Sequence, residues 1–195
     1  MQPNSLRHRD QTTEELMANF EEQQTDQKEQ LMGDDALNKI RELLKHFRSA
    51  MLTTVTADGS LSTRPMGLQG DADQFEGTLW FFADSRSAKA QLVKTGAHTA
   101  LVLQNDDKSS YLHMTGRASV ERNLPKMQEI YTPLLKTWFP DGLEDPNLAL
   151  IRFDADKVDY WESPGGMFQV LGAFTKAVVS GEPGAGGHAG TANLP

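Results

Sequence analysis

The sequence predicts a mainly β fold of the α+β class, an antiparallel barrel with helices at its rim. Two observations support this expectation: β-prone runs follow one another through short polar turns, and only a few segments have helical periodicity. Short turns require antiparallel neighbours, because parallel strands need crossover connections of a dozen or more residues. A closed or partly open barrel is therefore favoured over a doubly wound parallel sheet.

Six strands are expected, and local signals position several of them. Asp58-Gly59 separates the first two β-prone runs, which predicts a tight hairpin because glycine accepts a positive φ. Residues 109–121 alternate between apolar and polar side chains, with Gly116 easing a bend or bulge. Pro65 lacks an N–H and is expected where ladder pairing is interrupted. The expected strands cover residues 51–56, 60–66, 79–83, 98–104, 109–121 and 148–162.

Helical segments surround these strands. Apolar residues at helical spacing over 35–48, behind Asp34 and Asp35 as capping residues, predict an amphipathic helix. A short helix is expected to follow the serines at 85 and 87 and to stop at Gly96. Asn123 is expected to cap another helix that Pro133 kinks or splits. The last helical segment is expected over residues 165–179.

The charge distribution divides the chain into a body and two ends. Residues 1–35 contain nine acidic and three basic residues, a balance of −6 out of the total of −8. We interpret residues 1–34 as an acidic, polar N-terminal extension, a solvated tail or weak helix, with a partner-binding arm as the alternative. Residues 35–180 form the single expected domain. Residues 181–195 are rich in glycine and are expected to be a flexible tail.

Composition excludes several functional classes. The chain contains no cysteine, so disulfides, thiolate metal sites and cysteine nucleophiles are impossible. No basic run suits nucleic acid, and no stretch reaches the ~20 apolar residues that span a membrane. The N-terminus lacks the apolar run of a signal peptide, so a cytoplasmic location is expected. The five histidines are scattered without ligand spacing, and no metal site is expected.

One cluster of polar residues suits an anion. Ser85, Arg86, Ser87 and Lys89 lie at the start of the expected short helix, where free N–H groups and the helix dipole favour negative charge. Arg64, from the neighbouring hairpin strand, could close over the same group in bidentate fashion. On the residues alone, a phosphate cradle and ordinary helix capping with solvated charges both remain open.

Four segments together resemble a known family. They are Arg64-Pro65-Met66, the strand Trp80-Phe81-Phe82, the pair Ser87-x-Lys89, and the run YWESPGG at 160–166. In this order they resemble the split-barrel FMN-binding superfamily of pyridoxamine 5'-phosphate oxidase, and more narrowly its bacterial general stress protein branch. The resemblance covers residues 35–180 and implies a six-stranded antiparallel split β-barrel with peripheral helices.

The resemblance also implies a cofactor and its ligands. In that family an arginine, a serine and a lysine bind the phosphate of FMN, roles that fall here on Arg64, Ser87 and Lys89. The backbone after the arginine lies along the isoalloxazine ring, which implicates Pro65 and Met66. FMN is therefore the expected cofactor, with FAD as a possibility.

Further site residues and a partner follow from the same resemblance. The strand with Trp80, Phe81 and Phe82 is expected to line the site. Family members are homodimers with two flavins at the subunit interface, and Tyr111 and Trp161 are the candidates for contacts across it. No catalytic acid or base can be named, because a bound flavin performs the redox step itself.

Two departures from the oxidase pattern bear on the substrate. The oxidase has Ser-Arg-Lys where this chain has Ser87-Ala88-Lys89, so one phosphate-binding cation is missing. After Trp161 the chain lacks the arginine and histidine that grip the vitamin phosphate, and oxidation of vitamin B6 phosphates is not expected. The expected function is a stress-related, FMN-dependent oxidoreductase acting on an unidentified small-molecule redox partner. The alternatives are a non-catalytic module that stores or senses flavin, or a barrel that binds FAD, haem or a deazaflavin.

Overall fold

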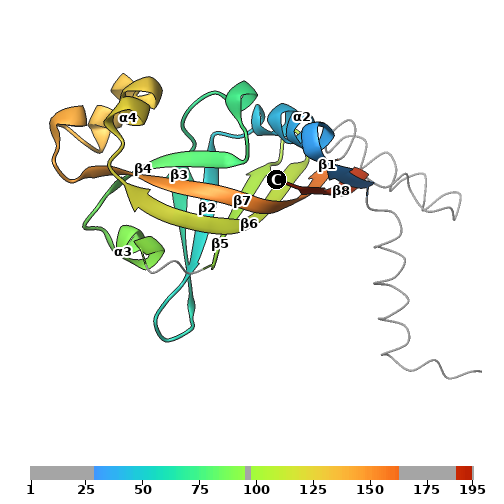
Figure 1. The fold of residues 1–195 in the computed structure, drawn as a ribbon, viewed down its shortest axis with the longest axis horizontal. Coiled ribbons are helices and arrows are strands. Elements are labelled where there is room, and N and C mark those ends of the chain that lie inside the picture. Colours follow the sequence, from blue (N-terminus) through green and yellow to red (C-terminus); the bar gives the residue numbers. More distant parts are fainter. Residues whose placement is uncertain (1–28, 95–97, 163–187, 195) are drawn as a thin grey trace, which may run out of the picture.

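One β-sheet organises the computed structural model, which describes residues 29–94, 98–162 and 188–194 (Figure 1). Helices lie at the ends and on one side of this sheet. The elements in chain order are β1 (Glu29–Met32), α2 (Gly33–Leu44), β2 (Ser49–Val55), β3 (Leu61–Gly67), η1 (Ala72–Gln74), β4 (Thr78–Asp84), α3 (Ala88–Lys94), β5 (His98–Asn105), β6 (Ser110–Glu121), α4 (Leu124–Ile130), η2 (Pro133–Thr137), η3 (Gly142–Glu144), β7 (Leu148–Glu162) and β8 (His188–Asn193).

The sheet has the antiparallel, split-barrel architecture that the sequence predicts. Its strand order is β1-β8-β7-β6-β5-β2-β3, and β4 pairs with the first half of β7. Strands β2 to β7 are the six expected strands, and every pairing among them is antiparallel. Between β3 and β4 the described residues form a single bridge, Gln69 to Trp80, so the barrel is open there.

Two of three local predictions about the strands are confirmed. Gly59 has a φ of +84° in the turn that joins β2 to β3. The β6–β7 register shifts between Thr115 and Gly116, and a Cβ at Gly116 would lie 2.0 Å from the carbonyl oxygen of Asp154. The prediction for Pro65 is wrong, because the β2–β3 ladder continues through it without interruption and Pro65 lies opposite Met51. The missing N–H is tolerated because β3 is the last strand in the sheet order.

The core consists of two hydrophobic clusters separated by β4. Leu79, Phe81 and Ala83 point into the barrel, whereas Trp80 and Phe82 point to the smaller cluster beneath α4. On β6, Leu112 and Met114 are 1% and 0% exposed, as the alternating pattern predicts. Burial on both sides explains why β4 reads as a continuous apolar run without alternation.

The helices agree with the sequence in position and differ in detail. Helix α2 begins at Gly33, so Asp34 and Asp35 lie in its first turn, where they favour the helix dipole, and do not cap it. Asn123 caps α4 by accepting from the N–H of Lys126, and the helix gives way to η2 at Pro133, as expected. The expected helix at 165–179 and the stop at Gly96 lie outside the described residues.

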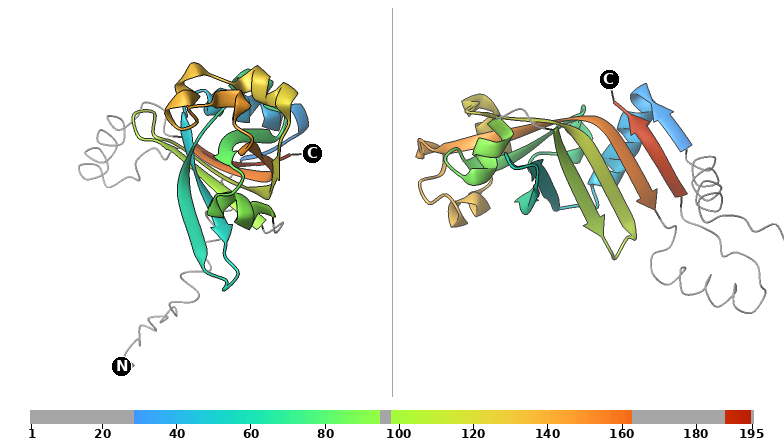
Figure 2. Two further views of the ribbon diagram at one scale, coloured as in Figure 1. Left: turned by 90° about the vertical axis from the view of Figure 1, so that its left-hand side faces the viewer. Right: turned by 90° about the horizontal axis from the view of Figure 1, so that it is seen from below.

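The two ends of the chain require a correction. Residues 188–193 form β8, so the expected flexible tail at 181–195 does not extend over them. Strand β1 lies within the expected N-terminal extension and pairs with β8 in parallel, next to α2 (Figure 2). Gly190 makes this possible, because a Cβ there would lie 2.2 Å from the ring of Tyr160. The Tyr160 hydroxyl donates to Glu29 at 2.8 Å and ties β1 to β7.

Candidate functional site

Strand β3 carries Arg64 on the face of the sheet that is directed to the barrel interior. Alternation along β3 places Arg64 and Met66 on the same face, opposite Leu52 and Ala50 of β2. Met66, Leu52 and Ala50 are buried in the barrel cluster. The aliphatic part of Arg64 therefore continues the core, and its guanidinium lies at the edge of that core.

The guanidinium of Arg64 is only partly satisfied. Its Nη2 donates to the Thr54 hydroxyl at 2.6 Å and to the Ser62 carbonyl oxygen at 2.5 Å. Its Nη1 is buried and has no hydrogen-bond partner among the described residues. An unpaired buried donor costs ~1–3 kcal/mol, more for a charged group, so this position fits an acceptor supplied from outside the chain.

Lys89, in the first turn of α3, adds a second positive charge near Arg64. Burial lowers the pKa of Lys89, the positive charge of Arg64 lowers it further, and Asp84 raises it. Burial also lowers the pKa of Arg64. No carboxylate of the described chain forms an ion pair with Lys89. The site thus holds two neighbouring cations, and Asp84, which offsets part of the Lys89 charge, is itself paired with Arg86.

Ser87 joins β4 to α3 and is engaged locally. Its hydroxyl donates to the Asp84 carbonyl oxygen at 2.6 Å and accepts weakly from the N–H of Ala90 at 3.4 Å. The loop thereby fixes the start of α3 and with it the position of Lys89. Ser87 precedes Lys89 by two residues in the chain, and its hydroxyl would have to turn to donate to a ligand.

Arg86 does not replace the cation that the sequence lacks at Ala88. Its Nη2 and Nε contact the carboxylate of Asp84 at 2.8 and 3.1 Å. The hydrogen bonds from Arg86 hold the pKa of the Asp84 carboxyl at about 2. Because Arg86 is paired with Asp84, Arg64 and Lys89 are the two cations of this region without an ion-pair partner among the described residues.

The expected residues of β4 do not all point to this site. Phe81 is fully buried and shares the barrel cluster with Met66. Trp80 and Phe82 point to the opposite side, where Lys126 lies 5.8 Å from the Trp80 ring centroid and Tyr131 packs edge-on against Phe82. The sequence could not separate these orientations, because all three residues are apolar.

Tyr111 and Trp161 are cross-strand neighbours on the outer face of the sheet. They are 38% and 39% exposed, on β6 and β7. Met51 and Val102 form a second exposed pair on the same sheet, and Met51 lies opposite Pro65 of β3. We call these five residues the outer apolar face. It reaches the strand of Arg64 from the outside, which fits contacts from a partner chain.

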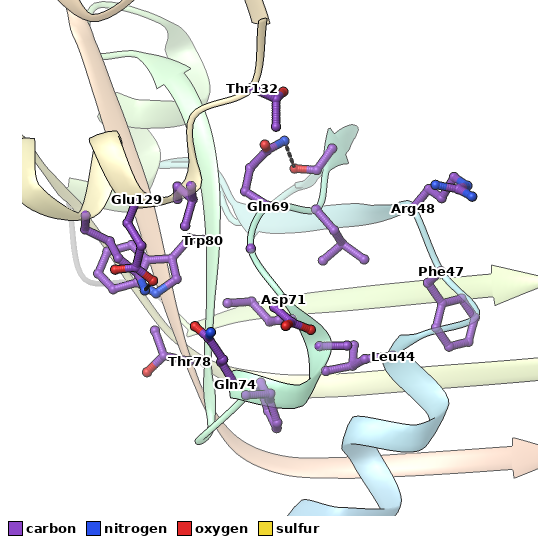
Figure 3. A pocket seen from close by; sticks show the side chains of 18 of the residues that line it. Leu44, Phe47, Arg48, Gln69, Asp71, Gln74, Thr78, Trp80, Glu129 and Thr132 are labelled. Carbon is purple, nitrogen blue, oxygen red and sulfur yellow. Dashed lines mark hydrogen bonds and ion pairs between the residues drawn. The ribbon is translucent and has the colours of Figure 1, made fainter. Parts of the chain in front are cut away.

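A cavity of about 720 Å³ lies between the end of α2, the segment after β3, β4 and the α4–η2 region (Figure 3). Among the expected site residues only Trp80 lines it. Its other walls include Gln69, Gln74 and Trp138, which sequence reasoning did not connect. Gln69 and Gln74 come from the segment between β3 and β4, and Trp138 comes from a distant segment after η2, so no local pattern signals the cavity.

Two features are absent from the described ranges. No helix among them is long and apolar enough to cross a membrane. Within the same ranges, no three side chains of the metal-binding types gather into a group that could hold an ion.

Comparison with known proteins identifies relatives. The model of a family described as "Pyridoxamine 5'-phosphate oxidase like" matches residues 35–184. Protein bli-3 of Neurospora crassa is 25% identical over 163 residues, which cover 77% of this chain and 76% of that protein.

Solved structures agree with this family. A structure assigned to general stress protein 26 of Jannaschia sp. CCS1 superposes with a TM-score of 0.68 at 23% identity, covering 83% of this chain and 100% of that one, and supports the fold. A general stress FMN/FAD-binding protein of Xanthomonas citri is 26% identical with a TM-score of 0.57, covering 67% of this chain and 90% of that chain.

Proposed function

The chain belongs to the pyridoxamine 5'-phosphate oxidase like family, and we propose that it is a flavin-binding general stress protein that holds FMN through Arg64, Ser87 and Lys89. The observation that carries this proposal is the buried Nη1 of Arg64, unpaired within the described residues and close to an unneutralised Lys89. A phosphate monoester supplies both the acceptor oxygens and the negative charge that these groups lack.

The geometry of β3 supports a position for the rest of the cofactor. Beyond Arg64 the strand continues through Pro65 and Met66 along an open edge, and backbone groups at such an edge are available to a ligand. We propose that the isoalloxazine ring lies along these two residues, with the buried Phe81 behind them. The Xanthomonas citri relative, described as FMN/FAD-binding, favours a flavin over other ligands of the barrel.

The protein side chains have a limited part in the proposed chemistry. FMN supplies reversible hydride and electron transfer when bound, which amino-acid side chains do not. Arg64 and Lys89 bind and orient the phosphate, and the barrel core excludes water behind the ring. We propose an oxidoreductase that acts on an unidentified small molecule. Vitamin B6 phosphates are disfavoured, because Trp161 is followed by Glu162 and not by cations.

We also propose that two copies of the chain assemble through the outer apolar face. Burying large side chains such as Tyr111 and Trp161 removes apolar surface from water at ~25 cal/mol per Å². The face adjoins β3 at Pro65, so a partner docked there would reach the strand proposed to hold the ring.

An absorption spectrum of the freshly purified protein tests the cofactor directly. The two visible bands of an oxidised flavin are expected, and chromatography after denaturation identifies FMN, FAD, haem or a deazaflavin. A colourless protein that does not bind added FMN would refute the proposal. Oxidation of a reduced nicotinamide by the loaded protein separates an oxidoreductase from the alternative, a module that stores or senses flavin without turnover.

A further inference from the structure

We propose that the 720 Å³ cavity beside β4 is a second ligand site, and that it takes an uncharged, planar aromatic carbonyl compound of the quinone class. Its volume lies within the range of ~300–1,000 Å³ that is usual for small-molecule pockets. Its lining includes Gly67, Gln69, Trp80 and Trp138. Figure 3 shows Gln69 and Trp80 among the side chains around the cavity.

The cavity begins where the proposed flavin strand ends. Gly67, the last residue of β3, lines the cavity and follows Arg64 by three positions, a span of ~10 Å at strand spacing. A ligand in the cavity would thus lie beyond the ring end of a flavin whose phosphate is at Arg64. This proximity rests on the proposed function. Binding to the cavity does not, and is measured separately below.

The charges around the cavity argue against a phosphate or carboxylate ligand. Lys45 contacts Asp73 at 2.8 Å and Glu42 at 2.9 Å, and these hydrogen bonds raise the pKa of Lys45. Lys126 contacts Glu129 at 2.6 Å. Lys45 and Lys126 therefore already have carboxylate partners, whereas Lys89 has none among the described residues.

The other charges on the wall do not alter this balance. Arg48 and Asp71 also line the cavity; Arg48 is exposed, and the Asp71 carboxylate accepts from the N–H of Asp73. The cavity as a whole therefore lacks the concentrated positive charge that an anion would need. An uncharged ligand avoids the desolvation cost that an unpaired anion would incur there.

The tryptophan side chains that line the cavity favour a flat ligand. Trp138 and Leu134 line the cavity and remain 65% and 68% exposed, although large apolar side chains favour burial. Trp80 offers an indole on another wall. A planar ring system would cover these surfaces, and aromatic contacts of this kind contribute ~0.5–1.5 kcal/mol beyond the area that they bury.

Side-chain amides supply the polar complement. Gln69 donates from Nε2 to the Gly67 carbonyl oxygen at 3.2 Å, and the amide of Gln74 has no hydrogen-bond partner within the described chain. Figure 3 shows both amides on the walls, from the segment between β3 and β4. An amide N–H can donate to a ligand carbonyl without requiring a charge. Carbonyl oxygens on a flat ring are the groups that a quinone presents.

Isothermal titration calorimetry of the full chain, with and without its flavin, tests the proposal with 2-methyl-1,4-naphthoquinone and pyridoxal 5'-phosphate as probes. We expect the naphthoquinone to bind both forms. Trp138→Ala and Gln74→Ala should each weaken naphthoquinone binding about tenfold, which corresponds to ~1.4 kcal/mol. The exposed controls Leu61→Ala and Gln104→Ala should not change it, and pyridoxal 5'-phosphate should bind at least about tenfold more weakly.

Three results would overturn the proposal: no naphthoquinone binding, equal effects of cavity and control variants, or tighter binding of the phosphate compound. Naphthoquinone binding to a protein that takes no flavin would refute the proposed function and leave the cavity site standing. Flavin binding without naphthoquinone binding would refute the cavity site and leave the proposed function standing. Competition between naphthoquinone and FMN would identify the cavity as part of the flavin site and would also overturn the proposal.

Discussion

Arg64 and Lys89 approach each other from β3 and α3, and the positive charge of Arg64 lowers the pKa of Lys89. Neither cation has a carboxylate partner among the described residues, whereas Arg86 next to them is paired with Asp84. Two like charges held together oppose folding unless something balances them. This arrangement is the basis for the phosphate site that we propose between β3 and the start of α3.

Removal of either cation should weaken the binding of FMN. Arg64→Ala and Lys89→Ala are each expected to reduce the affinity by ~1.5–3 kcal/mol, the range for a hydrogen bond to a charged group. Fluorescence titration measures this loss, and riboflavin, which has no phosphate, should be affected much less. Arg86→Ala is the matched control and should leave FMN binding unchanged. Equal losses for riboflavin and FMN would contradict the phosphate assignment.

The affinity for FMN should fall as the pH rises through the lowered pKa of Lys89. In the free protein Lys89 loses its proton at a lower pH than an ordinary lysine, and a bound phosphate raises its pKa again. Between these two values binding takes up a proton, so the affinity decreases with increasing pH. Titrations of FMN from neutral to alkaline pH measure the slope of the affinity against pH. The slope should be smaller in Lys89→Ala, and an unchanged slope would exclude this lysine from the site.

Truncation of the inner face of β6 should destabilise the barrel. Leu112→Ala and Met114→Ala are each expected to lower the free energy of unfolding by ~2–5 kcal/mol, because the buried side chains leave cavities. Denaturant unfolding measures the loss. Thr115→Ala, an exposed neighbour, should change stability by less than ~0.5 kcal/mol. A similar small change at Met114 would mean that this side chain lies outside the core.

A side chain at Gly190 should disturb the end of the sheet. A Cβ there would lie 2.2 Å from the Tyr160 ring, which is fully buried. We expect Gly190→Ala to lower the melting temperature and to speed amide hydrogen exchange in β1 and β8. His188→Ala, at an exposed position of the same strand, should have little effect. Identical behaviour of the two variants would argue against β8 as part of the sheet.

A charge on the outer apolar face should dissociate the proposed dimer. Val102 is 42% exposed beside Met51, and an aspartate there would bury an unpaired charge at the interface. Light scattering after size exclusion should show dimers for the wild type and for Leu124→Asp, and monomers for Val102→Asp. A monomeric wild type would refute assembly through this face.

Periodicity made much of the fold predictable. Strand β6 alternates because one side is buried, Gly116 marks the register shift, and Pro133 begins η2 after the end of α4. These are local rules that a sequence expresses directly. The residues alone allow Arg64 to lie near the start of α3 but leave ordinary capping open, because no spacing rule brings a hairpin strand to a distant helix. Only the family resemblance assigns Arg64 and Lys89 to one phosphate.

Other features could not be predicted, for physical reasons. Strand β8 consists of small and polar residues, so backbone pairing and the absence of a side chain at Gly190 define it, and neither has a compositional signature. Trp80 and Phe82 were grouped with Phe81 because a strand buried on both sides has no polar positions to reveal its orientation. The cavity depends on loops that converge only after folding.

The parallel pair of β1 and β8 joins the two ends of the described chain. Pairing β1 with β8 closes a loop that contains nearly all of the chain between the two ends. The loss of chain entropy on closing this loop must be met before the pairing gives any stabilisation. The pair is therefore expected to assemble after the antiparallel meander, late on the folding pathway. During unfolding it is the natural place for fraying to begin, while the barrel between these strands remains intact.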